Sequence, residues 1–372
     1  MKCKFLEHGI AIGYDHVVKP CCEWTPDPEW NRQNHISQVD LKTWHQSPQV
    51  IRIQDQLAQN IWPNSCQRCA TQEHQGRQDS MRLNGQHSCS DYQSQDITLE
   101  IRPGSVCNFA CQTCWPAASS RVAQYHHQAG LIDIQTVNSN SIDNFDLLLP
   151  VADRVRNVVL LGGEPFYDPS CQKFLIWAQQ NLQASITMFT NGSHVDWAWV
   201  DSYAGKITMV FSIDAVGQAA EYVRYGTDWP VVLENYRRAQ THSKVELRVN
   251  ITMSVYNYHL ILDVINWLTP QWPTVVSFGQ PRQLHLTETA IPTKNRPELI
   301  TRLQEAVDQL LAADIESGQQ HNAINAIQSV IANLKQSNFD PVQFNKLKQF
   351  VNSMDQVKRI NIATSANPVD FA

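Results

Sequence analysis

The stretch of sequence that decides the fold is residues 97–114, which read ITLEIRPGSVCNFACQTC. It begins with a short run of β-branched and apolar residues, passes through a proline and a glycine, and ends in Cys107, Cys111 and Cys114. Such runs, bounded by proline and glycine, are typical of buried strands. The stretch therefore predicts a strand that leads directly into a loop of thiols, and ligands of open α/β sheets bind at this end of the strands.

After residue 97 the sequence alternates between short β-rich runs and helix-length stretches. The expected strands cover residues 97–101, 157–161, 185–190, 206–213, 244–253 and 274–278. The expected helices cover residues 116–129, 170–182, 197–204, 230–242 and 256–268. Strands that are separated by helices pair in parallel through right-handed crossovers. We therefore expect an α/β fold of six β/α units over residues 97–282, arranged as an open sheet or a partial barrel.

Residues 1–90 have a different character, because prolines are scattered through them. We expect a small, loop-rich module with one amphipathic helix over residues 50–61, on whose inner face Ile51, Leu57 and Ile61 lie. Few apolar residues are available for a core, so metal ligation would have to stabilise this module. The polar residues 84–95 are expected to form a linker.

The last part of the chain, residues 296–372, is expected to be a helical extension. Apolar residues recur there at helical spacing in three runs, the third of which follows Asp340-Pro341. Aspartate and proline are a favourable N-cap and first residue for a helix. The apolar faces predict that these helices pack against the α/β domain.

Charge and hydropathy exclude several classes of protein. With 29 basic and 35 acidic residues, a net charge of −6 and no long basic run, nucleic acid is not expected as a partner. Apolar runs are far shorter than the ~18 residues that span a membrane, so no membrane association is expected. The N-terminus lacks the apolar core of a signal peptide, which favours a cytoplasmic protein in a reducing compartment. Ten cysteines in that compartment indicate metal ligands or redox groups.

The three cysteines of the loop fit an iron–sulfur cluster. The C-x3-C-x2-C spacing of Cys107, Cys111 and Cys114 is too rare to be accidental at ten cysteines in 372 residues. Three thiolates on one loop can hold three irons of a [4Fe–4S] cluster and leave the fourth iron open for a ligand. Zinc is the alternative, but a closed zinc site wants four protein ligands.

This loop resembles the signature of the radical S-adenosylmethionine (SAM) enzymes, and the resemblance covers residues 97 to about 280. A second motif agrees with it, because Gly162-Gly163-Glu164 follows the second expected strand and resembles the GGE element of that family. Its glycines permit close approach of the backbone, so strand-end amides, carbonyls and Glu164 would hold the methionine ammonium of SAM. The resemblance implies a partial (β/α)6 radical SAM barrel over residues 97–282.

Weaker matches lie at the ends of the later strands. The resemblance implies further SAM contacts at Ser212, Asp214, Arg224, Asn250 and Thr252. The arginine would clamp the SAM carboxylate in a forked pair, and the asparagine and threonine would reach the ribose hydroxyls. For each of these side chains, a capping or solvated role is the alternative.

The loop departs from the family pattern at one position. The family usually has an aromatic residue immediately before the third cysteine, where it packs on adenine, and Thr113 stands there in this chain. Trp115 or Phe109 would then have to make that contact.

A second group of cysteines lies in the N-terminal module. Cys3, the pair Cys21-Cys22, and Cys66-x2-Cys69 together resemble the twitch module, the shorter relative of the SPASM domain. The resemblance implies one auxiliary iron–sulfur cluster, ligated by Cys3, by Cys21 or Cys22, and by Cys66 and Cys69. A zinc knuckle is the alternative for this module.

Two cysteines fall outside both groups. Cys89 has no assigned role, and Cys171 stands at the start of an expected helix. A thiol at a helix N-terminus has either a depressed pKa, which would suit hydrogen donation or iron ligation, or the role of a small packed residue.

The resemblance also implies an activity. Radical SAM enzymes cleave SAM reductively at the [4Fe–4S] cluster and use the 5′-deoxyadenosyl radical to abstract hydrogen from a substrate. Relatives with a twitch or SPASM module often act on peptides or proteins, so a peptide or protein substrate and its post-translational modification are expected here. A flavodoxin- or ferredoxin-type protein would donate the electron. The alternatives are a zinc-stapled binding protein and an iron–sulfur electron-transfer protein without catalysis.

Overall fold

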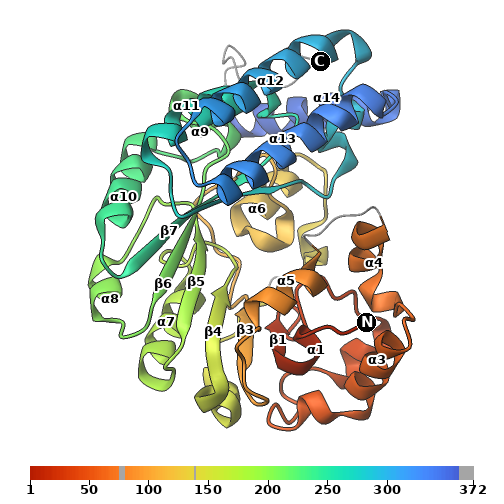
Figure 1. Cartoon of the computed structure of the whole chain (residues 1–372), viewed down its shortest axis with the longest axis vertical. Helices are drawn as coiled ribbons and strands as arrows, with labels where there is room; N and C mark the ends of the chain where they lie inside the picture. Colours follow the sequence, from red (N-terminus) through yellow and green to blue (C-terminus); the bar gives the residue numbers. More distant parts are fainter. Residues whose placement is uncertain (75–79, 138–139, 360–372) are drawn as a thin grey trace. The chain divides into compact units, whose positions relative to one another are not determined.

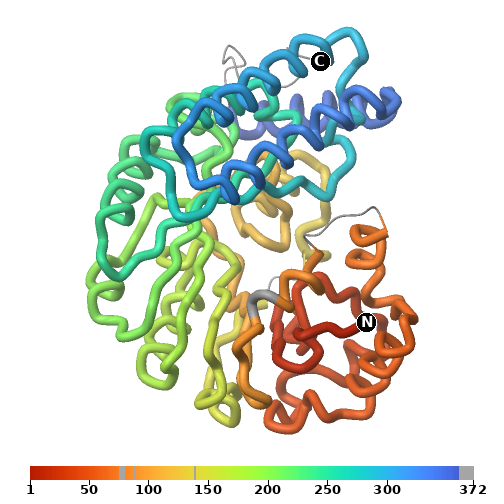
Figure 2. Tube along the Cα trace, in the orientation of Figure 1, coloured from red at the N-terminus to blue at the C-terminus, as the bar shows by residue number. Residues whose placement is uncertain are grey.

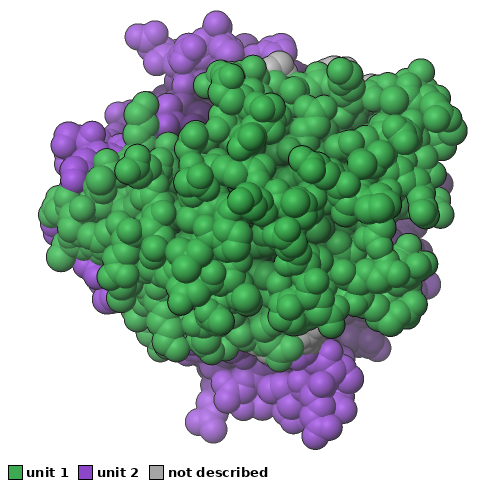
Figure 3. Space-filling model, turned by 90° about the horizontal axis from the view of Figure 1, so that it is seen from below, with its two compact units in different colours: residues 1–105, 138–188, 198–207 green, residues 106–137, 189–197, 208–372 purple. Residues whose placement is uncertain are grey.

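The computed structural model describes residues 1–74, 80–137 and 140–359, and Figure 2 follows the trace of the chain. The chain divides into two compact units, which Figure 3 colours separately. Unit 1 comprises residues 1–105, 138–188 and 198–207. Unit 2 comprises residues 106–137, 189–197 and 208–372.

Unit 1 is built on a mostly parallel sheet. Its strands follow the order β2-β1-β3-β4-β5, with bounds Val18–Lys19, Gly9–Ile12, Ile97–Ile101, Val155–Leu160 and Ser185–Thr190 (Figure 1). β1 runs parallel to β3, β3 to β4 and β4 to β5, whereas β2 is antiparallel to β1. Every residue of β1 and β3 is buried, as is typical of parallel strands covered on both faces.

The N-terminal segment is more regular than the sequence predicts. Its helices are α1 (Phe5–His8), α2 (Pro28–Gln33), η1 (Trp44–Gln46), α3 (Pro48–Ala58), η2 (Asn64–Cys66), α4 (Gln67–His74) and α5 (Met81–Ser88). The expectation that this segment lacks an apolar core is wrong. Its buried side chains include Leu6, Ile10, Ile12, Val18, Trp30, Leu41, Trp44, Val50 and Leu57. Two of its strands extend the sheet, so the sheet itself supplies part of this core.

Two local predictions for this segment are wrong in part, although the expected helix forms and buries Leu57. Helix α3 begins earlier than expected because the Ser47 hydroxyl caps it, and its buried face carries Val50 and Leu57, whereas Ile51 is 42% exposed and Ile61 is 50% exposed. The expected linker at residues 84–95 instead begins within helix α5. Helix α5 packs closely on Phe5 at Gly85, because a Cβ there would lie 2.7 Å from the ring of Phe5.

The remaining helices of unit 1 bring aromatic side chains together. They are η5 (Phe145–Arg154), α7 (Pro169–Asn181) and all but the first residue of α8 (Trp197–Ser202). Asp168 caps α7, since its carboxylate accepts hydrogen bonds from the N–H groups of Ser170 and Cys171. The rings of Phe145 and Phe174 lie 5.3 Å apart, so η5 packs on α7.

Unit 2 continues the alternation of strands and helices. Its strands are β6 (Ile207–Ser212), β7 (Val245–Thr252) and β8 (Val275–Gly279), in that order, and β7 runs parallel to β8. Its helices before residue 272 are η3 (Pro116–Ala118), α6 (Ser120–Gln128), η4 (Ile134–Thr136), α9 (Gly217–Val223), α10 (Trp229–Thr241), η6 (Tyr258–Leu260), α11 (Ile261–Leu268) and η7 (Thr269–Gln271). The six expected strands correspond to β3–β8, which confirms the α/β fold.

The C-terminal helices form as expected. They are α12 (Arg296–Ala312), α13 (Ser317–Gln336) and α14 (Pro341–Lys358), preceded by three short turns, η8 (Leu284–Leu286), η9 (Glu288–Ala290) and η10 (Thr293–Asn295). Asp340 caps α14, as the sequence predicts. α12 packs on α11 and α13, and α14 packs on α6, η8 and η9. Residues 360–372 of the expected extension lie outside the described residues. Within the described chain, no helix combines the length and the apolar character that crossing a membrane requires.

Candidate functional site

The cysteines of the C-x3-C-x2-C motif lie in an irregular loop after β3. The Cys107 sulfur accepts a hydrogen bond from the N–H of Phe109 at 3.4 Å, and the Cys114 N–H donates to the Cys111 carbonyl at 3.3 Å. Burial raises the pKa of the Cys111 and Cys114 thiols, and the neighbouring sulfurs of Cys111 and Cys107 raise that of Cys114 further. The structure therefore brings these three thiols together within unit 2.

A buried ion pair lies beside this loop. Arg224 donates through Nη1 to the carboxylate of Asp214 at 2.7 Å, and Asp214 is only 1% exposed. The same carboxylate accepts a hydrogen bond from the N–H of Thr252 at 2.7 Å. Burial acts to lower the pKa of Arg224, but the neighbouring Cys111 thiol and Asp214 act to raise it and prevail. The guanidinium is therefore a fixed cation close to Cys111, and Asp214 is placed to hold it.

One nitrogen of this guanidinium is left unused. The Nε atom of Arg224 is buried and has no hydrogen-bond partner among the described residues. A buried donor without a partner costs free energy, so such a group is expected to bind something. Arg224 thus fits the predicted contact to an anionic ligand group.

The other residues that the sequence assigns to SAM are spread over the strand ends of unit 2. Ser212 ends β6, and Thr252 ends β7. The side chain of Asn250 accepts a hydrogen bond from the Ser277 hydroxyl at 3.0 Å, which ties β7 to β8. Asn250 is therefore already engaged, whereas Asp214, Arg224 and Thr252 form one connected group.

The sequence gives only a weak signal for the polar residues beside Cys107. Asn191 donates to the side chain of Asn108 at 2.9 Å and lies 3.9 Å from the Cys107 sulfur. The signal is the position of Asn191 in the triplet Thr190-Asn191-Gly192 at the end of β5. Gly192 has a φ of 74°, and a Cβ there would lie 2.7 Å from the ring of Phe211, so the turn requires glycine.

The Gly162-Gly163-Glu164 motif forms a tight turn after β4 in unit 1. Gly162 has a φ of 141°, and a Cβ there would lie 2.6 Å from the Gly104 carbonyl oxygen. The N–H of Gly163 donates to this same oxygen at 2.9 Å. Glu164 is 1% exposed. The two glycines therefore let the turn after β4 lie directly against the turn after β3.

Of the two aromatic candidates for the adenine contact, only one has an open face. Phe109 is 1% exposed, whereas Trp115 is 48% exposed. The guanidinium of Arg282 lies 5.9 Å from the centre of the Trp115 ring. Trp115 is thus the candidate that has a surface to offer a ligand.

The N-terminal cysteines gather in unit 1. Burial raises the pKa of Cys3, and the nearby Cys69 thiol raises it further. Burial also raises the pKa of Cys66 to about 12, with additional effects from Cys3 and Cys69. The pKa of Cys21 is raised by burial and by its neighbours Cys22, Cys3 and Cys66. Four thiols, those of Cys3, Cys21, Cys66 and Cys69, therefore lie within electrostatic reach of one another.

Cys22 has different surroundings. Burial raises its pKa most, and Glu100 raises it next, both through its charge and through a hydrogen bond from the thiol to the carboxylate. Glu100 in turn lies 2.7 Å from Nη1 of Arg102. The adjacent thiols of Cys21 and Cys22 thus have different neighbours. This difference bears on which of them is a cluster ligand, a question that the sequence left open.

The two other cysteines are packed inside unit 1. Cys89 and Cys171 are both 0% exposed. Burial and the charges of Asp168 and Glu164 raise the pKa of Cys171 well above its ordinary value. The hypothesis of a depressed pKa at this helix start is therefore wrong, and Cys171 has the role of a small packed residue.

The donor set of the loop fits an iron–sulfur cluster. Three thiols, which are soft ligands, lie on one loop beside a buried cation that favours their ionised form. In the described part of the chain, no three or more His, Cys, Asp or Glu side chains form a group that could hold a metal ion.

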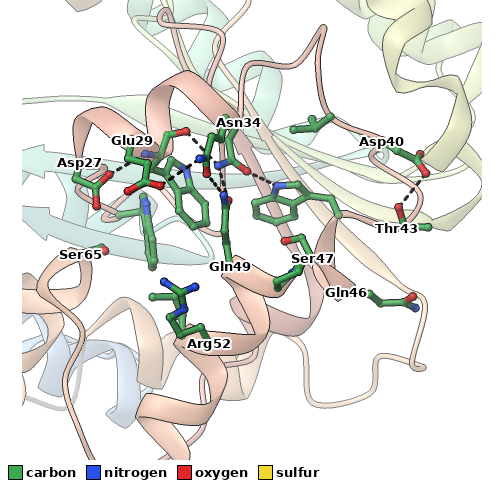
Figure 4. A pocket seen from close by; sticks show the side chains of 17 residues that line it. Asp27, Glu29, Asn34, Asp40, Thr43, Gln46, Ser47, Gln49, Arg52 and Ser65 are labelled. Atoms are coloured by element: carbon green, nitrogen blue, oxygen red, sulfur yellow. Dashed lines mark hydrogen bonds between the residues drawn. The ribbon is translucent and has the colours of Figure 1, made fainter.

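A separate pocket of about 810 Å³ opens in the N-terminal segment (Figure 4). Its lining includes the indoles of Trp24, Trp30 and Trp44 together with amide and charged side chains such as Asn34 and Arg52. Trp44 donates to the Asn34 side chain at 2.9 Å, which fixes one wall of the pocket. The size of the pocket is in the range of ligand-binding clefts.

Residues 101–268 match the model of the radical SAM superfamily. This part of the chain, 168 of the 372 residues, is therefore a domain of the radical SAM superfamily of enzymes, and its parallel α/β sheet is the partial barrel of that superfamily. A [4Fe–4S] cluster and SAM are the cofactors that membership implies. The expectations of fold and enzyme class are confirmed.

Solved structures resemble this chain distantly. Native anSMEcpe with bound AdoMet and Cp18Cys peptide matches 57% of this chain and 60% of its own, at 16% identity and a TM-score of 0.40. Streptococcus suis SuiB bound to precursor peptide SuiA matches 63% of this chain and 52% of its own, at 16% identity and a TM-score of 0.36. The matched region thus spans between half and two thirds of these relatives. No curated protein matches the sequence.

Proposed function

We propose that Cys107, Cys111 and Cys114 hold a [4Fe–4S] cluster at which the enzyme cleaves SAM reductively, so that a 5′-deoxyadenosyl radical can abstract hydrogen from a substrate. The observation that carries this proposal is that the three thiols lie on one loop beside the buried Arg224 guanidinium. When bound, the cluster supplies the electron that this cleavage needs. The protein contributes three thiolates and a fixed cation beside them.

The residues that the sequence assigns to SAM receive specific roles in this proposal. Arg224 offers its free Nε to the SAM carboxylate, and Asp214 is a positioning residue that holds the guanidinium. The turn at Gly162, Gly163 and Glu164 contacts the methionine amino group. Ser212, Asn250 and Thr252 are the proposed contacts to the ribose end of SAM, and Trp115 is the proposed contact to adenine.

Anaerobic purification tests this function. We expect the full-length protein to hold iron and acid-labile sulfide and to release 5′-deoxyadenosine from SAM when a strong reductant such as dithionite is added. Zinc in place of iron would support a binding protein. Iron and sulfide without any 5′-deoxyadenosine would support an electron carrier.

A second cluster is proposed in the N-terminal module. Cys3, Cys21, Cys66 and Cys69 are its ligands, because these thiols neighbour one another. Cys22 is not a ligand in this proposal, since its thiol neighbours the Glu100 carboxylate, which raises its pKa.

The adjacent cysteines allow a matched test of this second cluster. We expect Cys21→Ser to lose about half of the bound iron if both clusters are [4Fe–4S], and Cys22→Ser to keep all of it. Equal iron in the two variants would contradict the assignment of Cys21. Zinc in the wild-type module would identify a zinc knuckle instead.

A peptide or protein is the proposed substrate, and a flavodoxin- or ferredoxin-type protein is the proposed electron donor. The pocket in the N-terminal segment supports a peptide, because indole and amide side chains together suit a chain with apolar side groups and polar backbone. We expect a short peptide encoded beside the gene to raise the yield of 5′-deoxyadenosine and to change in mass. A small metabolite that does this alone would overturn the peptide assignment.

A further inference from the structure

The last residue of helix α14 reaches the cysteine loop from the far end of the chain. Lys358 is 4% exposed, and its ammonium donates to the carbonyl oxygen of Ala110 at 2.9 Å and to the Gln112 side chain at 3.0 Å. Ala110 and Gln112 are the two residues that flank Cys111. A side chain 246 residues away in sequence therefore holds the loop on both sides of its central cysteine.

A second set of contacts fixes the end of α14 against the same region. The hydroxyl of Tyr225 donates to the carbonyl of Lys358 at 2.9 Å, and Lys358 Nζ lies 5.2 Å from the centre of the Tyr225 ring. The hydroxyl of Tyr222 donates to Asp355, one turn earlier in the helix, at 3.2 Å. Both tyrosines flank the Val223-Arg224 pair, so α14 braces the segment that carries the buried arginine.

The loop and this segment are also joined by their backbones. The N–H of Ala110 donates to the Tyr225 carbonyl at 2.7 Å, and the N–H of Gln112 donates to the Val223 carbonyl at 2.9 Å. Lys358 therefore completes a three-part assembly within unit 2, made of the cysteine loop, the arginine segment and the end of α14.

Asp355, one turn earlier in α14, is the carboxylate neighbour of Lys358, but it forms no direct ion pair with it. Among the described residues Lys358 forms no ion pair, and its hydrogen-bond acceptors are neutral oxygens. A buried ammonium costs free energy unless anionic groups lie nearby. The pKa of Lys358 is lowered to about 8, chiefly by burial, whereas Cys111, Asp355 and Cys114 act to raise it. Of these neighbours, the two sulfurs become anionic on ligation.

We propose that Lys358 is a positioning residue that fixes the cysteine loop and places a positive charge beside its cluster. This inference rests on the proposed role of the loop as cluster ligand. It makes the C-terminal extension part of the active site, where the sequence predicts only packing. A fixed cation near the cluster stabilises the reduced, more negative state, so its removal lowers the midpoint potential.

The test compares Lys358→Met with Lys346→Met, which removes an exposed lysine from the same helix. Backbone hydrogen exchange is measured on the full-length protein before and after anaerobic reconstitution, and the midpoint potential is measured by spectroscopically monitored titration. In Lys358→Met we expect the amides of residues 110–114 to exchange about tenfold faster, which is about 1.4 kcal/mol of lost protection, and the potential to fall. Lys346→Met should match the wild type in both readouts. Unchanged loop exchange in a folded Lys358→Met protein would overturn the proposal.

If Lys358→Met does not fold, a variant with a smaller structural change tests the same proposal. Tyr225→Phe removes only the hydroxyl that anchors the carbonyl of Lys358, and it should speed exchange in the loop severalfold. Wild-type exchange in this variant would also overturn the proposal. A wild-type protein that takes up no iron would contradict the proposed function. Hydrogen exchange before reconstitution would still test whether Lys358 fixes the cysteine loop.

Discussion

Asp214 contributes to the stability of the fold, in addition to its predicted role as a ligand contact. Its carboxylate joins Arg224 to the end of β7 and is almost fully buried. Removing one partner of a buried pair leaves the other charge without compensation, and this is costly. The two residues should therefore act as one unit.

We predict that Asp214→Asn lowers the free energy of unfolding by about 3 kcal/mol. The matched control is Asp143→Asn, which breaks the exposed pair with Lys173, where the side chains are 56% and 60% exposed, and should cost less than about 1 kcal/mol. Denaturant titration of both variants measures the difference. Similar losses in the two variants would contradict this reading of the buried pair.

His126 should make stability depend on pH. Burial, together with the nearby charges of Lys358 and His285, lowers its pKa to about 4. An unfolded histidine titrates near ~6.5, so between these values the unfolded chain binds the additional proton. The stability from neutral His126 is therefore fully present above about pH 6.5 and is lost as the pH falls toward 4.

The comparison of two adjacent histidines tests this pH dependence. His126→Phe should flatten the decline in unfolding free energy between pH 6.5 and pH 4, because it removes the titrating ring and keeps an aromatic contact with Phe350. His127→Phe changes an exposed residue of the same helix and should leave the decline intact. The same pH profile in both variants would show that another group is responsible.

At the scale of elements, the turns after β3 and β4 depend on each other. Gly162→Ala should lower the free energy of unfolding by about 2 kcal/mol, because its φ is 141° and its Cβ would meet the Gly104 carbonyl oxygen. Gly318→Ala, at a helical position with nothing within 4 Å of the new Cβ, should be neutral or stabilising by about 0.5 kcal/mol. Thermal unfolding of both variants measures the contrast, and an unaffected Gly162→Ala protein would refute the close approach.

The N-terminal segment should stay folded without its metal. Its buried tryptophans and its strand beside β3 give it a core, which the sequence did not predict. We therefore predict that the double variant Cys66→Ser/Cys69→Ser loses iron but retains wild-type resistance to limited proteolysis over residues 1–74. Rapid cleavage there would restore the original expectation that the metal stabilises the module.

At the scale of the whole molecule, the sequence predicted the elements that neighbouring residues determine, and it missed the contacts between distant parts of the chain. β3–β8 were predicted within two residues at each end because apolar β-rich runs mark them. β1 was missed, since it spans only four residues and its partner β3 lies more than 80 residues further along the chain. The contact of Lys358 with the cysteine loop leaves no periodic signal for the same reason. The cysteine motif was visible because ligand spacing within one loop is itself local.

The release of 5′-deoxyadenosine per chain in single variants of the cysteine loop is the most direct measurement of whether this loop ligates the cluster at which SAM is cleaved. Cys107→Ala, Cys111→Ala and Cys114→Ala should each fall to background after anaerobic reconstitution, while Cys22→Ser, which removes a thiol that neighbours Glu100, should release it at the wild-type rate. Wild-type release from any of the three loop variants would contradict the assignment of this loop as the ligand of the cluster at which SAM is cleaved.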